Sequence, residues 1–442
     1  MRIKTTTIRL SAILLLWVLV VIVIPYARLA SNAYPIYSTE SFSELLNPQG
    51  FIYPWICKLL AENVTGLIGL QLMFGIIMFL GLFVLLRKLG LNREIYTNAI
   101  VLSLLTPSFI FLFSQPNSSA FALALLVWGL ALVDSTRKLS KAAGFLLLCA
   151  SASSSGFWAL VVLVAALSYN RLIRDKLLAI SLAIISTGLF LSQIPETRFS
   201  SNLLNKLVFE FGAANGISLS VLLLGMLGLV LTWKRMPELK TTYFFVLLTI
   251  IAISFNFTQP YLLSFLLIIF SGYSLVRLKE KKWELMFLKR ATIILLMLSL
   301  IIPALMSMAL FMDATPTHQE TKAINFLAKL NTRGVVLTSG QLAPAVEFIA
   351  KLRALPEPAL ENRTMKDIEE MYHSMSLKET LSLMKAYNIS HILISESMKK
   401  SNRIWHEENE GLLFLLRNNE TFKLVYNESK VMVWEVRPEL TY

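Results

Sequence analysis

The first predicted loop of the chain gathers side chains that could do acid–base chemistry. Residues 31–55 contain two carboxylates, Glu40 and Glu44, among hydroxyl-bearing and aromatic residues. A carboxylate here could act as a general base that takes a proton from an acceptor hydroxyl. We therefore expect Glu40 to be the catalytic residue. The structural alternative is that its charge only favours the N-terminus of the helix that follows.

Glu44 also has a structural interpretation. Ser41 and Glu44 fit the S-x-x-E capping box, in which the glutamate accepts a hydrogen bond from the backbone amide of the helix N-cap. Glu44 is thus either a helix cap or a member of the predicted substrate-binding set.

Further residues could complete a substrate-binding site beside these carboxylates. Tyr53 lies in an aromatic stretch that could stack on a sugar, although aromatic residues also form the belt at a membrane interface. Arg28 and Lys58 could hold a lipid phosphate or could be snorkelling anchors. Arg198 and Lys206, on a later loop, could gate the site or form a solvated face.

The elements that must position these residues are mostly apolar helices. Of the 442 residues, 55% are hydrophobic and 16% charged, whereas a soluble domain carries about 25% charged residues. Apolar runs long enough to cross roughly 30 Å of hydrocarbon occur at 10–26, 64–86, 95–114, 119–133, 177–194, 217–233, 243–257, 261–276 and 291–312. The sequence therefore predicts a multi-pass membrane protein, with 10–26 as a retained helix rather than a signal peptide.

The run 142–168 decides the topology. It is either one helix or two short helices folded back at residues 151–156. Lys and Arg near helix ends favour the cytoplasmic side, and the folded-back form places 21 of the 25 basic residues of 1–312 there. This favours about eleven helices and an extracytoplasmic C-terminus. The carboxylates of the membrane half that then face outside are Glu40, Glu44, Glu62, Glu196 and Glu210.

The remaining residues, 313–442, are predicted to form a separate extracytoplasmic α/β domain. Short β-branched runs at 334–338, 389–395, 422–426 and 431–436 alternate with helical patterns. This alternation is typical of a mostly parallel sheet, with the last two strands as an antiparallel edge. Four N-x-[S/T] sequons, at Asn362, Asn388, Asn419 and Asn427, suit a surface outside the cytoplasm.

Several function classes are disfavoured. The net charge of +13 belongs to short segments between apolar runs, which does not fit a nucleic-acid-binding surface. All four histidines follow residue 312, so no histidine-ligated metal can be built from the membrane half alone. A transporter would need charge within its helices and two matching halves, and neither pattern is visible.

Three stretches of the sequence resemble the GT-C superfamily of membrane glycosyltransferases. They are the first loop running into G-F-I-Y-P at 50–54, the proline-containing segment 105–130, and the short-helix pair 142–168 with Q-P-Y-L-L at 259–263. The C-terminal domain resembles the globular domain of archaeal oligosaccharyltransferase-like proteins. The resemblance implies a polyprenyl-phosphate-linked sugar as donor and an extracytoplasmic glycan or protein as acceptor, bound at the cell membrane.

The chain departs from the family pattern at its acidic positions. Family enzymes usually place an Asp in the first loop, where Glu40 is the nearest match here. Asn117-Ser-Ser119 stands where related mannosyltransferases carry an acidic residue, in the turn before the predicted helix at 119–133. A second hypothesis therefore stays open, namely a non-catalytic GT-C-like scaffold or partner in surface-glycan assembly. The sequence does not indicate a cofactor.

Overall fold

In the computed structural model the chain forms two compact units. The structure describes residues 22–28, ten separate positions between 30 and 56, and the ranges 64–88, 90–133, 135–167, 176–192, 203–213, 215–233, 240–255, 260–330, 334–356, 362–400, 410–428 and 430–437. The helical unit comprises Met1–Pro25 and Pro48–Met312, and the globular unit comprises Tyr26–Asn47 and Asp313–Tyr442. The sequence predicted a boundary between the two domains at residue 312, which put Tyr26–Asn47 in the membrane domain, whereas in the structure this segment belongs to the globular unit.

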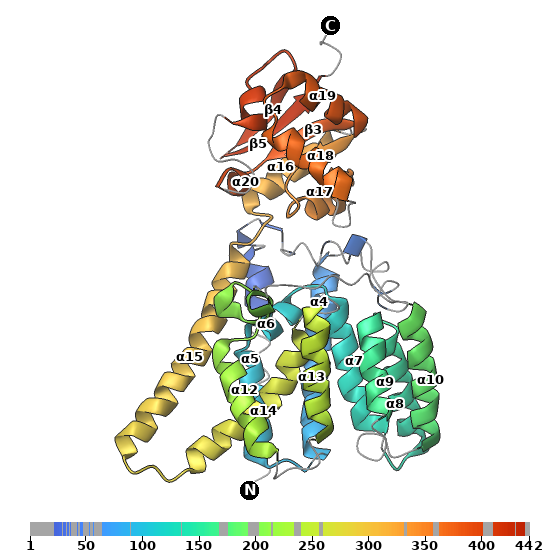
Figure 1. Cartoon of the computed structure of the whole chain (residues 1–442), viewed down its shortest axis with the longest axis vertical. Helices are drawn as coiled ribbons and strands as arrows, with labels where there is room; N and C mark the ends of the chain where they lie inside the picture. Colours follow the sequence, from blue (N-terminus) through green and yellow to red (C-terminus); the bar gives the residue numbers. More distant parts are fainter. Residues whose placement is uncertain are drawn as a thin grey trace. The chain divides into compact units, whose positions relative to one another are not determined.

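The helical unit is built from apolar helices at the predicted runs (Figure 1). In chain order its longer helices are α4 (Val64–Lys88), α5 (Arg93–Leu104), α6 (Pro107–Ser114), α7 (Ser118–Val133), α8 (Lys138–Ala152), α9 (Gly156–Leu167), α10 (Lys176–Ser192), α12 (Leu219–Thr232), α13 (Lys240–Ser254), α14 (Tyr261–Glu280) and α15 (Met286–Met312). Of the predicted run 10–26, only residues 22–26 are described.

The run 142–168 is two helices, as the folded-back interpretation predicts. α8 ends at Ala152, α9 begins at Gly156, and α7 to α10 lie side by side in Figure 1. Close approach of α7 and α8 depends on Gly144, where a Cβ atom would lie 2.8 Å from the Cα atom of Val133. Ser151 donates a hydrogen bond of 2.9 Å to the backbone oxygen of Ala122 across the same helix pair.

The predicted single run 95–114 is instead two helices joined at a sharp bend. α5 and α6 meet at an angle of 66°, and the break precedes Pro107. Proline lacks the backbone N–H of a helix interior and disfavours helical conformation in the residue before it. Thr106 is accordingly extended and forms the N-cap position of α6.

Polar side chains and small residues join the helices elsewhere. Ser271 and Ser274 of α14 donate hydrogen bonds to backbone oxygens of α12, at 2.9 and 2.8 Å. Gly228 of α12 faces the backbone of Phe270 in α14. The buried residues of α15 lie in its C-terminal half, where Phe311 packs against Phe111 of α6. Such small-residue contacts and interhelical hydrogen bonds are typical of helices packed in a membrane.

The described helices support a membrane protein but not a specific number of spans. By length and composition, three of them could cross a bilayer alone, and the bent α5–α6 pair could be a fourth. Five further described helices are apolar but shorter. The count of about eleven therefore stays a prediction.

The globular unit contains a five-stranded mixed sheet with strand order β2-β1-β3-β5-β4. Its strands are β1 (Val335–Leu337), β2 (Ala354–Leu355), β3 (Ile389–Ile394), β4 (Phe422–Glu428) and β5 (Val431–Val436). β1 pairs in parallel with β2 and β3, whereas β5 is antiparallel to both β3 and β4. The antiparallel edge hairpin was predicted, whereas the expected mostly parallel sheet is instead evenly mixed, with two parallel and two antiparallel pairings. The two-residue strand β2 was not predicted.

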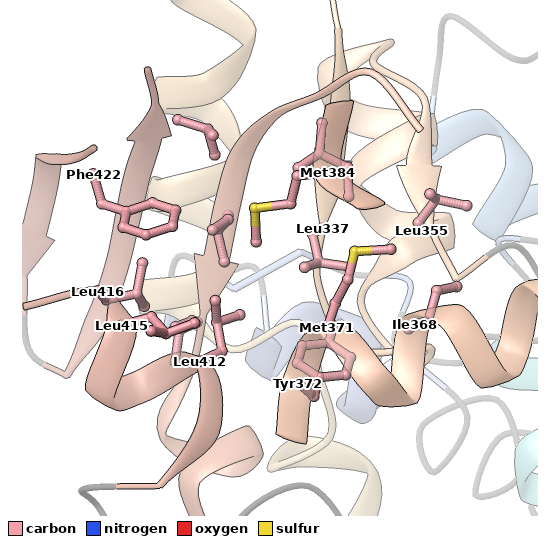
Figure 2. Packing of buried hydrophobic residues seen from close by; sticks show 14 of the residues in the cluster. Leu337, Leu355, Ile368, Met371, Tyr372, Met384, Leu412, Leu415, Leu416 and Phe422 are labelled. Atoms are coloured by element: carbon pink, nitrogen blue, oxygen red, sulfur yellow. The ribbon is translucent and has the colours of Figure 1, made fainter. Parts of the chain in front are cut away.

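Helices cover the sheet and complete its core. They are α16 (His318–Lys329), α17 (Ala343–Ala350), α18 (Asn362–His373), α19 (Leu377–Ala386), α20 (Glu396–Lys400) and α21 (Gly411–Leu415). Figure 2 shows side chains of α18 and α21, such as Met371 and Leu412, packed with Leu337, Leu355 and Phe422 of the strands. Burial of these apolar side chains is the main stabilising contribution in this unit.

A capping box begins α16. The Thr317 hydroxyl accepts a hydrogen bond from the Glu320 amide, and the Glu320 carboxylate accepts one from the Thr317 amide at 2.8 Å. The capping box predicted at Ser41 and Glu44 lies outside the described residues.

Candidate functional site

Arg28 is anchored inside the globular unit. Its side chain is 1% exposed, and its guanidinium donates hydrogen bonds of 2.8 to 2.9 Å to the backbone oxygens of Tyr34, Ala314 and Pro316. A buried charge is costly unless hydrogen bonds replace its water, and the forked guanidinium can reach several oxygens at once. These contacts give Arg28 a structural role, and its binding to a lipid phosphate stays a prediction.

Aromatic residues of the first loop pack beside this anchor. The rings of Tyr34 and Phe42 lie 5.8 Å apart, and both contact Phe348 of α17, at 6.5 and 5.8 Å between centroids. The Tyr34 amide also donates a hydrogen bond to the Thr321 hydroxyl of α16. Sequence reasoning did not single out Phe348 or Thr321, because nothing local marks them as partners of a segment more than 280 residues earlier.

The burial of Tyr34 limits what its hydroxyl can do. Burial raises the pKa of the Tyr34 phenol to about 12. At neutral pH the phenol is therefore protonated and cannot act as the general base of this loop.

Tyr53 is packed in the helical unit. Its ring is 2% exposed and lies 5.8 Å from that of Phe121 in α7, which in turn contacts Phe74 of α4. The ring for which both sugar stacking and a place in the interfacial belt were considered thus already has an aromatic neighbour. A role in substrate binding stays a prediction.

Buried polar side chains surround the turn between α6 and α7. Asn117 is 0% exposed, and its Oδ1 atom accepts a hydrogen bond of 2.7 Å from the Ser119 amide. Its Nδ2 atom has no hydrogen-bond partner among the described residues. Nearby, Gln71 donates to the backbone oxygen of Leu112 at 2.7 Å. Buried polar groups in an apolar bundle are costly, which makes this turn a candidate functional position.

In the described part of the later loop lie Lys206, one of its two predicted site residues, and a glutamate that caps a helix. Lys206 lies on the short helix α11 (Leu203–Leu207) and is exposed. Glu210, in the 3₁₀ helix η1 (Phe209–Phe211), accepts a hydrogen bond of 2.9 Å from the Leu219 amide at the start of α12. A carboxylate at a helix N-terminus is stabilising, so Glu210 has a capping role.

The remaining predicted site residues cannot be placed. Glu40, Glu44, Lys58 and Arg198 lie outside the described residues. Of the others, Arg28 belongs to the globular unit, whereas Tyr53 and Lys206 belong to the helical unit. Among the described residues, no three His, Cys, Asp or Glu side chains are grouped so that they could hold a metal ion.

Comparison of the sequence with protein families finds no match, and a search of curated proteins also finds none. Comparison of the fold does find solved neighbours. The Archaeoglobus fulgidus oligosaccharyltransferase tethered to an acceptor peptide is 10% identical, with a TM-score of 0.59 over 97% of this chain and 74% of that chain.

Two further solved structures are similar. AglB from the same organism, in complex with an inhibitory peptide and a dolichol-phosphate, is 11% identical, with a TM-score of 0.56 over 97% of this chain and 74% of that one. ArnT from Cupriavidus metallidurans is 11% identical over 98% and 99% of the two chains, with a TM-score of 0.49. The oligosaccharyltransferase matches establish similarity of fold, and at that level they confirm the resemblance to the GT-C superfamily of membrane glycosyltransferases.

Proposed function

We propose that this protein is a membrane glycosyltransferase that transfers a sugar from a polyprenyl-phosphate donor to an extracytoplasmic acceptor. The observation that carries the proposal is the fold match to an archaeal oligosaccharyltransferase, which extends over 97% of the chain and thus includes both units. One of these matched structures contains a dolichol-phosphate, and another an acceptor peptide. Both support a lipid-linked donor and a glycan or protein acceptor for this chain.

Glu40 is the general base in this proposal. An acceptor hydroxyl oxygen attacks the anomeric carbon, the bond from that carbon to the phosphate oxygen breaks, and polyprenyl phosphate leaves. The hydroxyl proton passes to the Glu40 carboxylate. Glu210 already accepts a hydrogen bond at the start of α12 and the Tyr34 phenol is protonated, which favours Glu40 over both.

The proposed orientation has the protein in the cell membrane with its globular unit outside the cytoplasm. Three of the four predicted sequon asparagines in this unit, Asn388, Asn419 and Asn427, are exposed. Exposed sequons are accessible to glycosylation enzymes, which act outside the cytoplasm. This supports the orientation obtained from the distribution of Lys and Arg.

One observation favours a second candidate function, a non-catalytic partner in surface-glycan assembly. Asn117 is fully buried where the resemblance predicts an acidic residue. An amide cannot take up a proton or supply the negative charge of a carboxylate. If that charge is needed for transfer, the protein would retain the GT-C fold without turnover.

Donor turnover distinguishes the two candidates. Purified protein in lipid vesicles would be given radiolabelled polyprenyl-phosphate hexoses, with and without a divalent cation, and with a mixture of cell-surface glycans and peptides as acceptors. The proposal predicts release of polyprenyl phosphate together with label on an acceptor. Donor binding without release of polyprenyl phosphate would contradict it and favour the partner function.

A further inference from the structure

The segment Tyr26–Asn47, which we call the strap, is part of the globular unit although it precedes the rest of that unit by more than 260 residues. Four of its described residues, Arg28, Ala33, Ile36 and Phe42, are buried, whereas Tyr26, Ala30 and Ser31 are exposed. Ile36 is 0% exposed and Phe42 is 1% exposed. Such burial shows that these residues pack as interior residues of the unit rather than as a solvated loop.

Arg28 fixes the beginning of the strap. Its guanidinium donates to the backbone oxygens of Ala314 and Pro316, in the chain leading into α16, and to that of Tyr34 within the strap. The Ala33 amide also donates to the Arg28 backbone oxygen at 2.9 Å. Charge-assisted hydrogen bonds are the stronger kind, and only the forked guanidinium can make all three.

Phe348 fixes the strap further along. Its ring contacts both Tyr34 and Phe42, and it belongs to α17, which packs against α16. The ammonium group of Lys351 lies 4.8 Å from the centre of the same ring. Two strap residues therefore share one aromatic partner in the globular unit.

We propose that the globular unit positions the catalytic carboxylate through this strap, with Arg28 and Phe348 as positioning residues. In the sequence Glu40 lies between the two anchored aromatic residues, six after Tyr34 and two before Phe42. Two residues of chain span at most about 7 Å, so the anchor at Phe42 restricts the space available to the carboxylate. This inference rests on the proposed function for its catalytic part, whereas the attachment of the strap is independent of it.

Two readouts on the full-length protein in lipid test the proposal. Hydrogen–deuterium exchange of peptides from 26–47 reports the attachment, and kcat and KM for sugar transfer report the positioning. The test variants are Phe348→Ala and Arg28→Lys. The matched control is Phe422→Ala, which removes an equally large buried ring from the core cluster around β4.

In the exchange experiment, Phe348→Ala should accelerate exchange in 26–47 by at least about tenfold relative to the β3 peptides. Without the ring, local opening of the strap costs less free energy, because no aromatic contact has to be broken. Phe422→Ala should accelerate exchange in the strands without this preference for the strap. Arg28→Lys should behave like Phe348→Ala, since an ammonium group cannot reach all three oxygens. Equal strap protection in wild type and Phe348→Ala would refute the attachment.

In the kinetic experiment, Phe348→Ala should lower kcat by up to about a hundredfold, the effect of misplacing a reacting group by roughly 1 Å, with little change in KM. Phe422→Ala, corrected for its folded fraction, should keep a near wild-type kcat. An equal loss of kcat in both variants would refute positioning. A wild-type protein with a protected strap but no transfer would retain the attachment and overturn both the proposed function and the catalytic role of Glu40.

Discussion

Replacing Gly228 by alanine tests the packing of the helical unit. A Cβ atom at this position of α12 would lie 2.6 Å from the Phe270 backbone carbon and 2.9 Å from the Phe270 Cβ atom in α14. Carbon atoms normally approach to about 3.5 Å, so the added methyl group is too close by roughly 0.9 Å. The closest atoms belong to the backbone, and the two helices must therefore separate.

The expected cost follows from that separation. Overpacking a tight contact typically costs about 1–3 kcal/mol, and moving α12 also strains the hydrogen bonds from Ser271 and Ser274. The matched control is Gly188 of α10, where an added Cβ atom meets nothing within 4 Å. Gly188→Ala should stabilise its helix by up to about 1 kcal/mol, the difference in helix propensity.

Unfolding in mixed micelles with an increasing fraction of dodecyl sulfate, followed by circular dichroism, compares the two variants. We expect Gly228→Ala to unfold at a lower fraction of dodecyl sulfate than wild type does. Gly188→Ala should unfold at an equal or higher fraction than wild type. A Gly228→Ala protein as stable as Gly188→Ala would refute the close approach of α12 and α14.

Three other predictions concern topology and the globular unit. Cysteines introduced at Ser140 and Asn170 should both be labelled only from the cytoplasmic side, and labelling from opposite sides would exclude the eleven-helix topology. Burial raises the pKa of the Tyr372 phenol, and its hydroxyl donates a hydrogen bond of 2.6 Å to a backbone oxygen after β1. Tyr372→Phe should lower the free energy of unfolding, measured by thermal unfolding, by about 1–3 kcal/mol. An unchanged stability would argue against this hydrogen bond. A hydrogen bond from Lys322 lowers the pKa of Glu428, so this ion pair stabilises the fold above the unfolded pKa of the carboxyl group and is lost as pH falls through its lowered folded pKa. Lys322→Met should reduce the loss of stability in acid, as measured by thermal unfolding across pH. An identical pH profile in the variant and wild type would contradict the assignment.

Much of the helical unit was predictable because its signals are local. The apolar run 64–86 became α4, and the serine-rich stretch 151–156 marked the end of α8 and the start of α9. The break before Pro107 was missed although its signal is local too, because hydropathy alone reads 95–114 as one continuous run. Hydropathy measures partition into the bilayer and does not report backbone hydrogen bonding.

The environment of the first loop was not predictable in the same way. Arg28 was expected either to bind a phosphate or to anchor at the membrane, yet its partners Ala314 and Pro316 lie 286 and 288 residues away. They are backbone oxygens, which every residue has, so no side-chain pattern marks them. The two-residue strand β2 was missed for a related reason, since its strand character comes from pairing with β1.

The central claim is tested most directly by the rate of sugar transfer from a labelled polyprenyl-phosphate donor in wild type, Glu40→Gln and Glu44→Gln proteins. General-base catalysis contributes about 10² to 10⁴ in rate, so Glu40→Gln should slow transfer at least about a hundredfold without changing expression. Glu44→Gln should only weaken a helix cap, by about 1 kcal/mol, and keep a near wild-type rate per folded molecule. Equal rates in wild type and Glu40→Gln would contradict the catalytic assignment.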